Sequence, residues 1–315
     1  MKTVLITGVC GFIGSNMIRH VVDKYPQYRF VGLDKLDEII NVKNIFTNKN
    51  YNFYSGDICD KTFMETVFKY EKPDYVIHMA AKSFVDSSIE DASCFIQSNV
   101  LGTQTIIDLC VKYKIEKLLY TSTDEVYGSL SQKDSSWTEL SVPKPRNPYS
   151  ASKYCGENLI YAANQTHKLN YLITRSCNNY GELQASRNLI PKLILNTIND
   201  KITPLHDHGK PFREWIYVLD KVKAIMTILS KSKMNEIYNI GSDVEIQNIQ
   251  MSSKIGKILG KEPHIAFTID RPGQDMRYSV DCSKLKKLGW NTSYKFDDAI
   301  KSTVEWYSKN QDYYK

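Results

Sequence analysis

Three glycines, Gly8, Gly11 and Gly14, stand between a short apolar run at residues 3–6 and a longer segment with helical spacing. In such a place the first glycine permits a tight turn, the second lets a ligand approach the backbone, and the third lets a helix pack closely on a sheet. The helix that follows supplies unpaired N–H groups and the positive end of its dipole. The GxxGxxG spacing, with a strand before it and a helix after it, therefore favours an α/β fold with a phosphate-binding turn.

An acid follows the next apolar run. Asp34 ends the run at residues 29–33 and lies twenty residues beyond Gly14. A carboxylate at this place can bind the ribose hydroxyls of an adenosine and would repel a 2′-phosphate. The sequence thus predicts a dinucleotide site that prefers NAD to NADP, although Lys35, directly beside the acid, weakens this preference.

Further cofactor contacts are expected where two more apolar runs end. Asp57, after the run at residues 51–54, can accept a hydrogen bond from the adenine amino group; alternatively it caps the following helix, for which Asp60 is the better candidate. Small residues after the run at residues 75–79 would let the cofactor lie against the backbone, and His78 is expected to be a packed polar residue. The predicted cofactor-binding residues are Gly8, Gly11, Phe12, Ile13, Gly14, Asp34, Lys35, Asp57, Ile58, Ala80, Ala81, Tyr149 and Lys153.

The first half of the chain alternates short apolar runs with longer segments of helical spacing. The runs are β-branched and bounded by Gly, Asp or Ser, as buried parallel strands are. Strands that alternate with helices form right-handed βαβ units, so we expect an α/β fold with a Rossmann-like doubly wound parallel sheet. The expected strands are residues 3–6, 29–33, 75–79, 117–121 and 171–174, and the expected helices are residues 12–24, 61–70, 98–113 and 149–167.

The pattern changes after about residue 176, where segments become shorter and prolines punctuate them. We expect residues 1–176 to form an NAD-binding domain that carries the catalytic residues. Residues 177–315 are expected to form mainly a smaller, mixed α/β portion that binds the substrate and caps the carboxyl ends of the sheet. Some of this second segment should return to the first domain.

Tyr149 and Lys153 open the last predicted helix on one face, one turn apart. A phenol with a pKa of about 10 is almost fully protonated at neutral pH and is then no base. A nearby ammonium and the positive nicotinamide of NAD favour the phenolate, so we expect a lowered pKa and a proton-accepting Tyr149. A YxxxK pattern is common by chance, but its place downstream of the dinucleotide turn favours the functional interpretation.

Thr123, Asp124 and Glu125 follow the apolar run at residues 117–121, at the end of a strand where ligands bind in parallel sheets. Neighbouring side chains of a strand point to opposite sides, so both acids reach one ligand only if a turn begins there; Gly128 and the polar run after it supply one. Two carboxyls at one site can have pKa values driven apart, which gives one acid and one base. A capping Asp with a solvated Glu explains the residues equally well.

These segments together resemble the nucleotide-sugar 4,6-dehydratases, which are extended short-chain dehydrogenases/reductases typified by dTDP-glucose 4,6-dehydratase and similar to the plant-type UDP-glucose 4,6-dehydratase domain. STDEVYG is the most specific segment, because related epimerases lack the acid pair and other relatives tend to keep only the Glu. Asp124 therefore discriminates most. In the family's order, from residue 3 to about residue 290, the matching segments are TGVCGFIG, LDKLD, GDI, HMAAKSFVDSSI, STDEVYG, NPYSASK, NNYG, REWIYVLD and RPGQDMRYSVD.

The resemblance implies a hydro-lyase that converts dTDP- or UDP-glucose into an NDP-4-keto-6-deoxyglucose and regenerates its NAD in each cycle. Tyr149, supported by Lys153 and Thr123, would deprotonate the glucose 4-hydroxyl while hydride leaves C4 for NAD. Glu125 would remove the proton at C5, and Asp124 would protonate the departing 6-hydroxyl. The hydride would then return to C6.

The resemblance also implies a set of substrate contacts. The arginines in this set suit phosphate oxygens, although an ordinary ion pair explains each of them as well. The implied substrate-binding residues are Ser83, Asp86, Thr123, Asn178, Arg187, Asn188, Arg213 and Arg277.

The chain departs from the family at several positions near these contacts. Lys82 stands where Glu or Gln is usual, Phe84 and Gln274 where His is usual, and Ser186-Arg187-Asn188 replaces a proline-glutamate-lysine triplet. These departures leave the choice of nucleobase open. LDKLD leans toward the UDP-glucose and eukaryotic-like members.

Composition excludes several other classes of protein. The 42% hydrophobic and 24% charged residues are ordinary for a globular chain, and a net charge of +6 without a block of like charge indicates no nucleic-acid partner. Seven scattered cysteines without a CxxC pair indicate neither a disulfide framework nor a zinc knuckle, and His206 and His208 lack a third ligand, so we expect no metal site. No apolar window reaches the length of a membrane span, and glycines interrupt the apolar N-terminal run, so a cytoplasmic protein is expected.

Two expectations complete the interpretation. The resemblance implies a homodimer in which residues 98–113 and 149–167 of both copies form a four-helix interface. Two competing functions stay open: a nucleotide-sugar 4-epimerase or decarboxylase, for which Asp124 would be dispensable, and a catalytically silent NAD-binding regulator that kept the fold.

Overall fold

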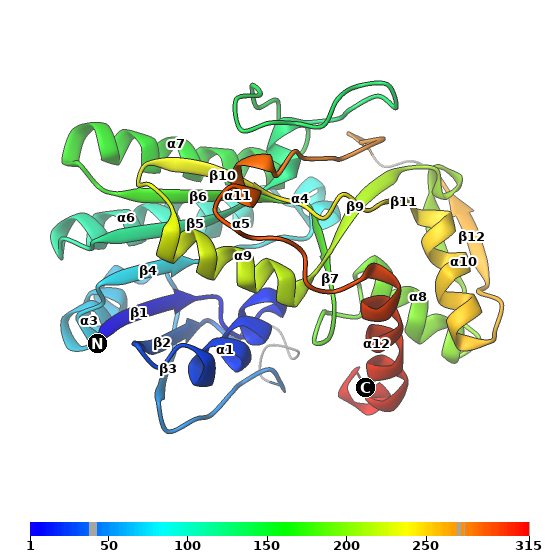
Figure 1. Ribbon diagram of the computed structural model, residues 1–315, viewed down its shortest axis with the longest axis horizontal. Coiled ribbons are helices and arrows are strands. Elements are labelled where there is room, and N and C mark those ends of the chain that lie inside the picture. Colours follow the sequence, from blue (N-terminus) through cyan, green and yellow to red (C-terminus); the bar gives the residue numbers. More distant parts are fainter. Residues whose placement is uncertain (38–42, 270–271, 274, 315) are drawn as a thin grey trace.

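The computed structural model describes residues 1–37, 43–269, 272–273 and 275–314. Its main element is a seven-stranded parallel sheet, shown in Figure 1. The predicted Rossmann-like doubly wound sheet is confirmed, and the strand order reverses at β1, which lies between β4 and β2. In sheet order the strands are β10 (Glu236–Ile240), β6 (Tyr171–Ser176), β5 (Lys117–Thr123), β4 (Tyr75–His78), β1 (Lys2–Thr7), β2 (Tyr28–Asp34) and β3 (Tyr51–Ser55).

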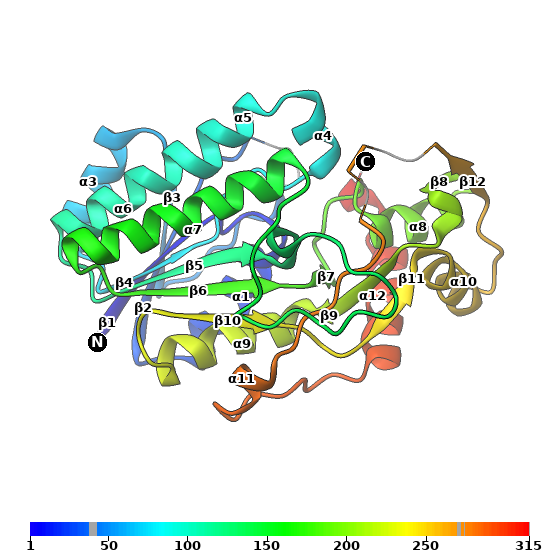
Figure 2. The ribbon, with the colours of Figure 1, turned by 90° about the horizontal axis from the view of Figure 1, so that it is seen from above.

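Helices cover both faces of this sheet, as Figure 2 shows. On one face lie α1 (Phe12–Lys24) and α9 (Val218–Lys231), and on the other α3 (Lys61–Glu71), α6 (Thr103–Lys112) and α7 (Pro148–His167). Alternate residues of β1 serve the two layers: Val4 and Ile6 pack with α1 and α9, and Leu5 packs with α3, α6 and α7. The apolar runs at residues 3–6, 29–33, 75–79, 117–121 and 171–174 therefore contain strands that are mostly buried on both sides.

The segment between β4 and α6 differs from the sequence expectation. Two short helices, α4 (Val85–Glu90) and α5 (Ser93–Phe95), are followed by a π-helix, η1 (Ile96–Gly102), where a continuous α-helix over residues 98–113 was expected. In the wider π turn the Asn99 carbonyl accepts a hydrogen bond from the Thr103 hydroxyl at 2.7 Å. Short π-helical turns inside α-helices are frequent at functional sites.

The rest of the chain builds a smaller part beside the carboxyl ends of the main sheet. It contains a three-stranded sheet, β11-β9-β7, and a two-stranded sheet, β12-β8. Chain from beyond residue 176 also returns to the main sheet, because α9 and β10 belong to it and α11 (Ser283–Lys286) packs beside β10. The elements of the smaller part are β7 (Asn178–Tyr180), α8 (Leu189–Ile198), β8 (Thr203–His206), η3 (Asp207–Gly209), β9 (Phe212–Tyr217), β11 (Glu245–Gln247), α10 (Asn248–Leu259), β12 (Ile265–Thr268), α12 (Phe296–Lys309) and η4 (Gln311–Tyr314).

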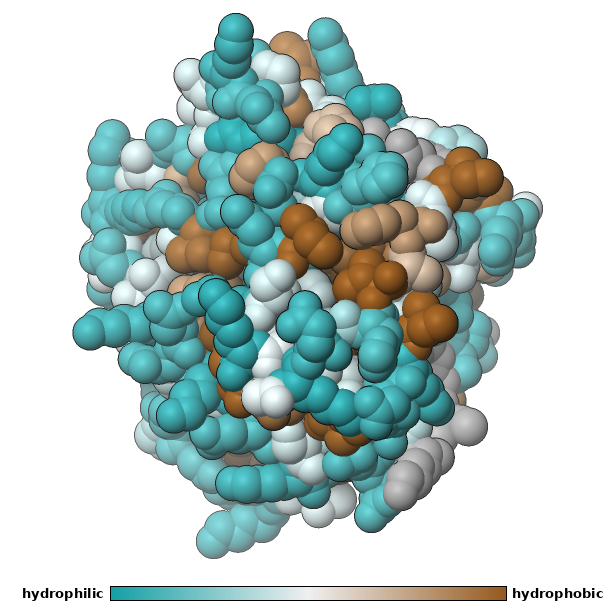
Figure 3. Space-filling view, turned by 90° about the vertical axis from the view of Figure 1, so that its right-hand side faces the viewer, coloured by the Kyte–Doolittle hydropathy of each residue, from teal (hydrophilic) through white to brown (hydrophobic). Residues whose placement is uncertain are grey.

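Figure 3 views the end of the molecule that includes α10 and β12, where apolar side chains form separate groups among polar ones. The large exposed apolar residues of this part are Ile202, Phe267, Ile269, Met276 and Tyr294. Among the helices that the structure describes, none is both long enough and apolar enough to span a bilayer.

The start of α7 is specified by its cap. Asn147 Oδ1 accepts a hydrogen bond from Ser150 N at 2.8 Å, the Ser150 hydroxyl lies 3.4 Å from Asn147 N, and Pro148 occupies the first turn. A fixed first turn sets the rotation of the helix about its axis. The cap thereby places Tyr149 and Lys153 on the side of α7 that faces the sheet edge.

A buried ion pair holds the same helix against the sheet. Arg175 Nε on β6 lies 3.1 Å from both carboxylate oxygens of Glu157 on α7, and Arg175 Nη2 lies 2.5 Å from Glu157 Oε2. Both side chains are only 4% exposed, and the guanidinium also lies 4.6 Å from the centre of the Tyr127 ring. Either charge alone would be buried without its partner, so the pair fixes α7 in place.

We expect Arg175→Met to lower the free energy of unfolding by about 3–5 kcal/mol, because Glu157 would keep a buried charge without a partner. Glu157→Leu should do the same to Arg175, and the double variant should recover most of the loss because it removes both charges. Urea unfolding of the four proteins, followed by circular dichroism, measures these differences. A double variant as unstable as the two single effects added together would contradict the account.

Candidate functional site

A cavity of about 770 Å³ runs along the carboxyl ends of the main sheet and is closed by side chains of the smaller part. Residues of α8, β8 and β9 face the glycine turn and the ends of β2, β4, β5 and β6 across it. Every cofactor-binding and catalytic residue predicted from the sequence lines this cavity. Of the predicted substrate contacts, Ser83, Asp86, Thr123, Asn178, Arg187, Asn188 and Arg213 line it and Arg277 does not.

The glycine turn forms a close-fitting cradle. Gly8 has φ +77°, and a Cβ on it would lie 2.7 Å from Ala80 N; a Cβ on Gly14 would lie 2.0 Å from Gly8 O. Gly11 is the N-cap of α1 and offers no side-chain partner to the first N–H groups of the helix. These free donors and the open backbone fit the phosphates of a dinucleotide.

The acids around this cradle are held by the backbone. Asp34 Oδ2 accepts from Cys10 N and Asp34 Oδ1 from Leu36 N, both at 2.9 Å, and burial raises the pKa of the carboxyl. Lys35 Nζ lies 2.8 Å from Asp57 Oδ2, so its charge is directed toward Asp57. Asp60, and not Asp57, caps α3 by accepting from Phe63 N at 2.9 Å. Asp57 is therefore not the capping residue of α3, and it lines the cavity.

His78 is a packed polar residue at the end of β4. It is fully buried, its Nδ1 lies 2.7 Å from Thr7 Oγ1, and its Nε2 lies 3.0 Å from Thr103 Oγ1. Burial lowers its pKa to about 3, which keeps the ring neutral. His78 therefore has a structural role, in which its ring links Thr7 of β1 to Thr103 of α6.

The two acids at the end of β5 both face the cavity. A 3₁₀ turn, η2 (Asp124–Tyr127), starts directly after β5, and Gly128 ends it with φ +91°. Thr123 caps the turn through a 3.3 Å hydrogen bond from Glu125 N, so Asp124 is not the capping residue. Glu125 is half-buried, and its Oε2 accepts from Asn147 Nδ2 at 3.0 Å. The capping-Asp and solvated-Glu alternative therefore does not describe this turn.

Asp124 has the surroundings of a neutral acid. The residue is 2% exposed, its Oδ1 lies 3.3 Å from the Thr123 hydroxyl, and its buried Oδ2 has no hydrogen-bond partner among the described residues. Burial, and then the charges of Glu125 and Glu214, raise the pKa of this carboxyl well above its usual range; Arg213 opposes them only in part. The carboxyl can therefore carry a proton at neutral pH.

Burial shifts the pKa values of the tyrosine and the lysine of α7. Burial and the charge of Glu125 raise the pKa of Tyr149, and a hydrogen bond from its neighbour Thr123 lowers it only partly. Lys153 is 3% exposed, its ammonium lies 4.0 Å from the centre of the Tyr120 ring, and burial lowers its pKa to about 7. Without NAD, burial outweighs the Thr123 hydrogen bond and the phenol pKa is raised, so the expected lowering by the ammonium together with the charge of NAD stays a prediction.

Two asparagines that sequence reasoning missed hold the site together. Asn147 caps α7 with its Oδ1 and holds Glu125 with its Nδ2. Asn99, in the π-helix, accepts from Lys82 N at 2.8 Å and donates to Lys82 O at 2.9 Å and to Ser152 Oγ at 2.8 Å. The Asn-Pro pair at the helix start is a sequence signal for the first; the second has no local signal, because its partners lie 17 and 53 residues away.

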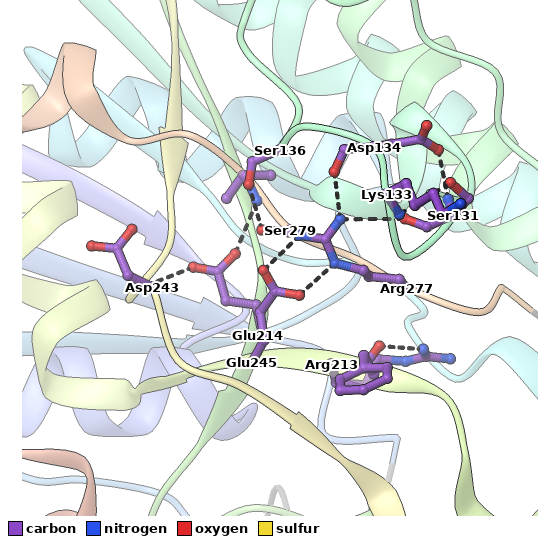
Figure 4. A network of polar contacts seen from close by, with 12 residues as sticks. Ser131, Lys133, Asp134, Ser136, Arg213, Glu214, Asp243, Glu245, Arg277 and Ser279 are labelled. Atoms are coloured by element: carbon purple, nitrogen blue, oxygen red, sulfur yellow. Dashed lines mark hydrogen bonds and ion pairs between the residues drawn. The ribbon is translucent and has the colours of Figure 1, made fainter.

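Arg213 and Arg277, which were both predicted to contact phosphates, lie in different surroundings, as Figure 4 shows. Arg213 lines the cavity, with its guanidinium 4.5 Å from the centre of the Tyr278 ring and its Nη1 donating to Phe212 O at 2.7 Å. Arg277 corrects the expectation, because it forms a two-point ion pair with Glu245 at 2.6 and 2.8 Å and donates to Asp134 O at 2.7 Å. The Arg277 guanidinium therefore links Glu245 to the loop after η2, outside the residues that line the cavity.

Two further residues of this region, Arg187 and Glu214, lie in different surroundings. Arg187 lies over the Phe84 ring at 5.1 Å, which joins two positions where the chain departs from the family. Glu214, beside Arg213, accepts from the backbone N–H groups of Ser242, Asp243 and Val280, and burial raises its pKa to about 7. Gln274 lies outside the described residues.

Comparisons with known proteins agree with this geometry. A family model described as GDP-mannose 4,6 dehydratase matches residues 5–303. The chain is 38% identical to a dTDP-glucose 4,6-dehydratase of Haemophilus influenzae, over 98% of this chain and 99% of that protein. It is 37% identical to a trifunctional enzyme of Arabidopsis thaliana whose name begins with UDP-glucose 4,6-dehydratase, over 99% of this chain and 48% of that protein.

A solved structure is similar over the whole length. The dTDP-glucose 4,6-dehydratase of Streptomyces venezuelae, crystallised with NAD and dTDP, superposes with a TM-score of 0.94 at 34% identity, over 99% of each chain.

The lowered pKa of Lys153 predicts a pH-dependent stability difference. The folded state holds the proton of Lys153 only below about pH 7, whereas the unfolded chain holds it up to the ordinary value of 10.5. The free energy of unfolding therefore rises as the pH increases from about 7 to 10.5 and falls as the pH decreases over the same range. Below the window the protein carries the full cost of the buried charge.

Lys153→Met removes that cost at every pH. We expect it to raise the free energy of unfolding by more than about 1 kcal/mol near pH 6, and by much less near pH 10. Urea unfolding of both proteins at the two pH values measures the difference. An equal increase in the free energy of unfolding at both pH values would show that burial does not destabilise the Lys153 ammonium.

Proposed function

The chain belongs to the nucleotide-sugar 4,6-dehydratases of the extended short-chain dehydrogenases/reductases, and we propose that it converts an NDP-glucose into an NDP-4-keto-6-deoxyglucose with NAD as its cofactor. The observation that carries this proposal is Asp124 on the cavity wall: its carboxyl is buried, its Oδ2 has no hydrogen-bond partner among the described residues, and burial with the nearby carboxylates raises its pKa well above the usual range. Loss of water from a sugar needs an acid for the departing hydroxyl, and the residues around Asp124 favour the protonated form of such an acid.

The cradle between Gly8 and Gly14 would hold NAD, with Asp34 available to its ribose hydroxyls and Ala80 and Ala81 on the adjoining cavity wall. When bound, NAD supplies the acceptor and later the donor of a hydride, and a positive charge that favours the phenolate of Tyr149. This charge is needed because the protein alone raises the pKa of Tyr149.

Each catalytic side chain then has one proton to move. Tyr149, hydrogen-bonded to Thr123, takes the proton of the 4-hydroxyl. Glu125, oriented by Asn147, removes the proton at C5, and the electron pair of that C–H bond forms the C5–C6 double bond as the C6–O bond breaks. Asp124 gives its proton to the leaving oxygen, so the departing group is water.

The rest of the cavity suits the nucleotide diphosphate. Arg213 and Arg187 place cations on its wall, and Asn178 has a buried Oδ1 without a hydrogen-bond partner among the described residues. We assign Ser83 and Asp86 to the sugar, and Asn178, Arg187, Asn188 and Arg213 to the diphosphate and nucleoside. Arg277 is removed from the set that the sequence predicted.

We also propose a homodimer and a cytoplasmic location. α6 and α7 lie side by side on the outside of the main sheet. Tyr161 on α7 exposes 56% of its surface and Leu101 on η1, directly before α6, exposes 54%, which supports pairing with a second copy. The cytoplasm provides the reducing conditions in which the seven free cysteines persist.

A product assay tests the function. We expect incubation with dTDP-glucose or UDP-glucose, without added reductant, to yield a 4-keto-6-deoxy product that mass spectrometry detects by the loss of one water. The faster substrate identifies the nucleobase. A C4 epimer of unchanged mass would support the epimerase alternative, and no product from either nucleotide would contradict the proposal.

Asp124→Asn should slow water loss by about 10²–10⁴-fold, because the amide cannot donate a proton to the 6-hydroxyl. Oxidation at C4 does not need this acid, so reduced nicotinamide should build up on the protein and be visible in its near-ultraviolet absorbance. Asp297→Asn, an exposed change on α12, serves as the matched control. Normal product formation by Asp124→Asn, or slow turnover without reduced nicotinamide, would reject the assignment.

A further inference from the structure

An ion pair crosses the turn that holds the dinucleotide. Lys82 Nζ, beyond the end of β4, pairs with Asp37 Oδ2, beyond the end of β2. β1 and its glycine turn lie between these two strands. The pair thus bridges about 10 Å, or two strand spacings, over the end of β1.

Both partners belong to the cavity wall. Lys82 and Asp37 line the same cavity as Gly8, Gly11 and Gly14, and their side chains are 36% and 28% exposed. Another ion pair at this rim, Lys35 with Asp57, joins the ends of the neighbouring strands β2 and β3 and does not span a third strand. Position across the groove distinguishes the Lys82–Asp37 pair from the exposed pairs that join adjacent helices, such as Lys61–Asp108.

One side of this bridge is fixed to the catalytic machinery. The backbone N–H and C=O of Lys82 are both hydrogen-bonded to Asn99, whose amide also reaches Ser152 on α7. On the other side, Asp34 holds Leu36 N, one residue before Asp37. The ion pair therefore joins two walls of the groove that are each anchored by separate hydrogen bonds.

We propose that Lys82 and Asp37 form a clasp over the dinucleotide, which must open before the cofactor leaves. The proposal rests on the NAD site of the proposed function and adds a device for retention, which suits a reaction that returns its hydride in each cycle. An exposed ion pair contributes modestly, so we expect its loss to speed cofactor release by about two- to fivefold. Salt should weaken the clasp in the same direction.

The test measures the rate at which preloaded NAD leaves the protein, with an excess of unlabelled NAD preventing rebinding. Lys82→Gln and Asp37→Asn should each release NAD faster by a similar factor, and the double variant should be no faster than either. The exchanged pair Lys82→Asp/Asp37→Lys should restore slow release. Lys254→Gln, which breaks an exposed ion pair between α10 and α12, is the control and should match the original protein.

Each other outcome overturns the clasp. Faster release from Lys82→Gln with no change in Asp37→Asn would mean that Lys82 contacts the cofactor directly. Effects of the two single changes that multiply in the double variant would mean that the residues act independently. Failure of the original protein to retain NAD would reject the proposed function as well, whereas retention with unchanged release from all variants would reject the clasp alone.

Discussion

The burial of one carboxyl governs the chemistry of this molecule. Asp124 directly follows β5 of the main sheet, lies beside Glu125 and near Glu214, and is almost fully buried. These surroundings favour the protonated form of the carboxyl, because a second negative charge at a buried position is costly. Asp124 lines the cavity and has a buried oxygen without a hydrogen-bond partner among the described residues, whereas its neighbour Glu125 stays partly exposed, so two carboxyl groups acquire opposite roles.

The second requirement is placement, and α7 provides it. The helix is held at its start by Asn147, near its middle by the Arg175–Glu157 pair, and on its inner face by the contact of Ser152 with Asn99. Each anchor reaches a different part of the site: Asn147 touches Glu125, and Asn99 touches the wall that carries Lys82. A shift of this helix would therefore displace the base, the tyrosine and the cofactor wall together.

Much of this architecture is readable from the sequence. Apolar runs separated by helical segments predict the parallel sheet, and glycines at a strand–helix junction predict the cradle, because both patterns reflect local geometry. The adjacent Asp124 and Glu125 could be placed at the ligand edge for the same reason. The fold and the predicted cofactor-binding and catalytic residues of the cavity follow from such signals.

Other features depend on partners distant in the sequence. The raised pKa of Tyr149 results from burial that only the assembled fold creates, and Arg277 is withdrawn by Glu245, 32 residues away. The two anchoring asparagines and the π-helix at Ile96–Gly102 likewise arise from contacts between segments. The positive charge of Arg277 suggested a phosphate contact, but in the fold this charge is paired with Glu245.

The protonation of Asp124 is the most direct measure of the account. Infrared difference spectra between the original protein and Asp124→Asn at neutral pH, recorded in H₂O and D₂O, isolate the absorption of this one carboxyl from that of Glu214 and the other acids. A protonated carboxylic acid band that shifts in D₂O and is lost in the variant is the predicted result. A difference spectrum with only an ionised carboxylate band would mean that Asp124 carries no proton to give, and would contradict the proposed dehydration.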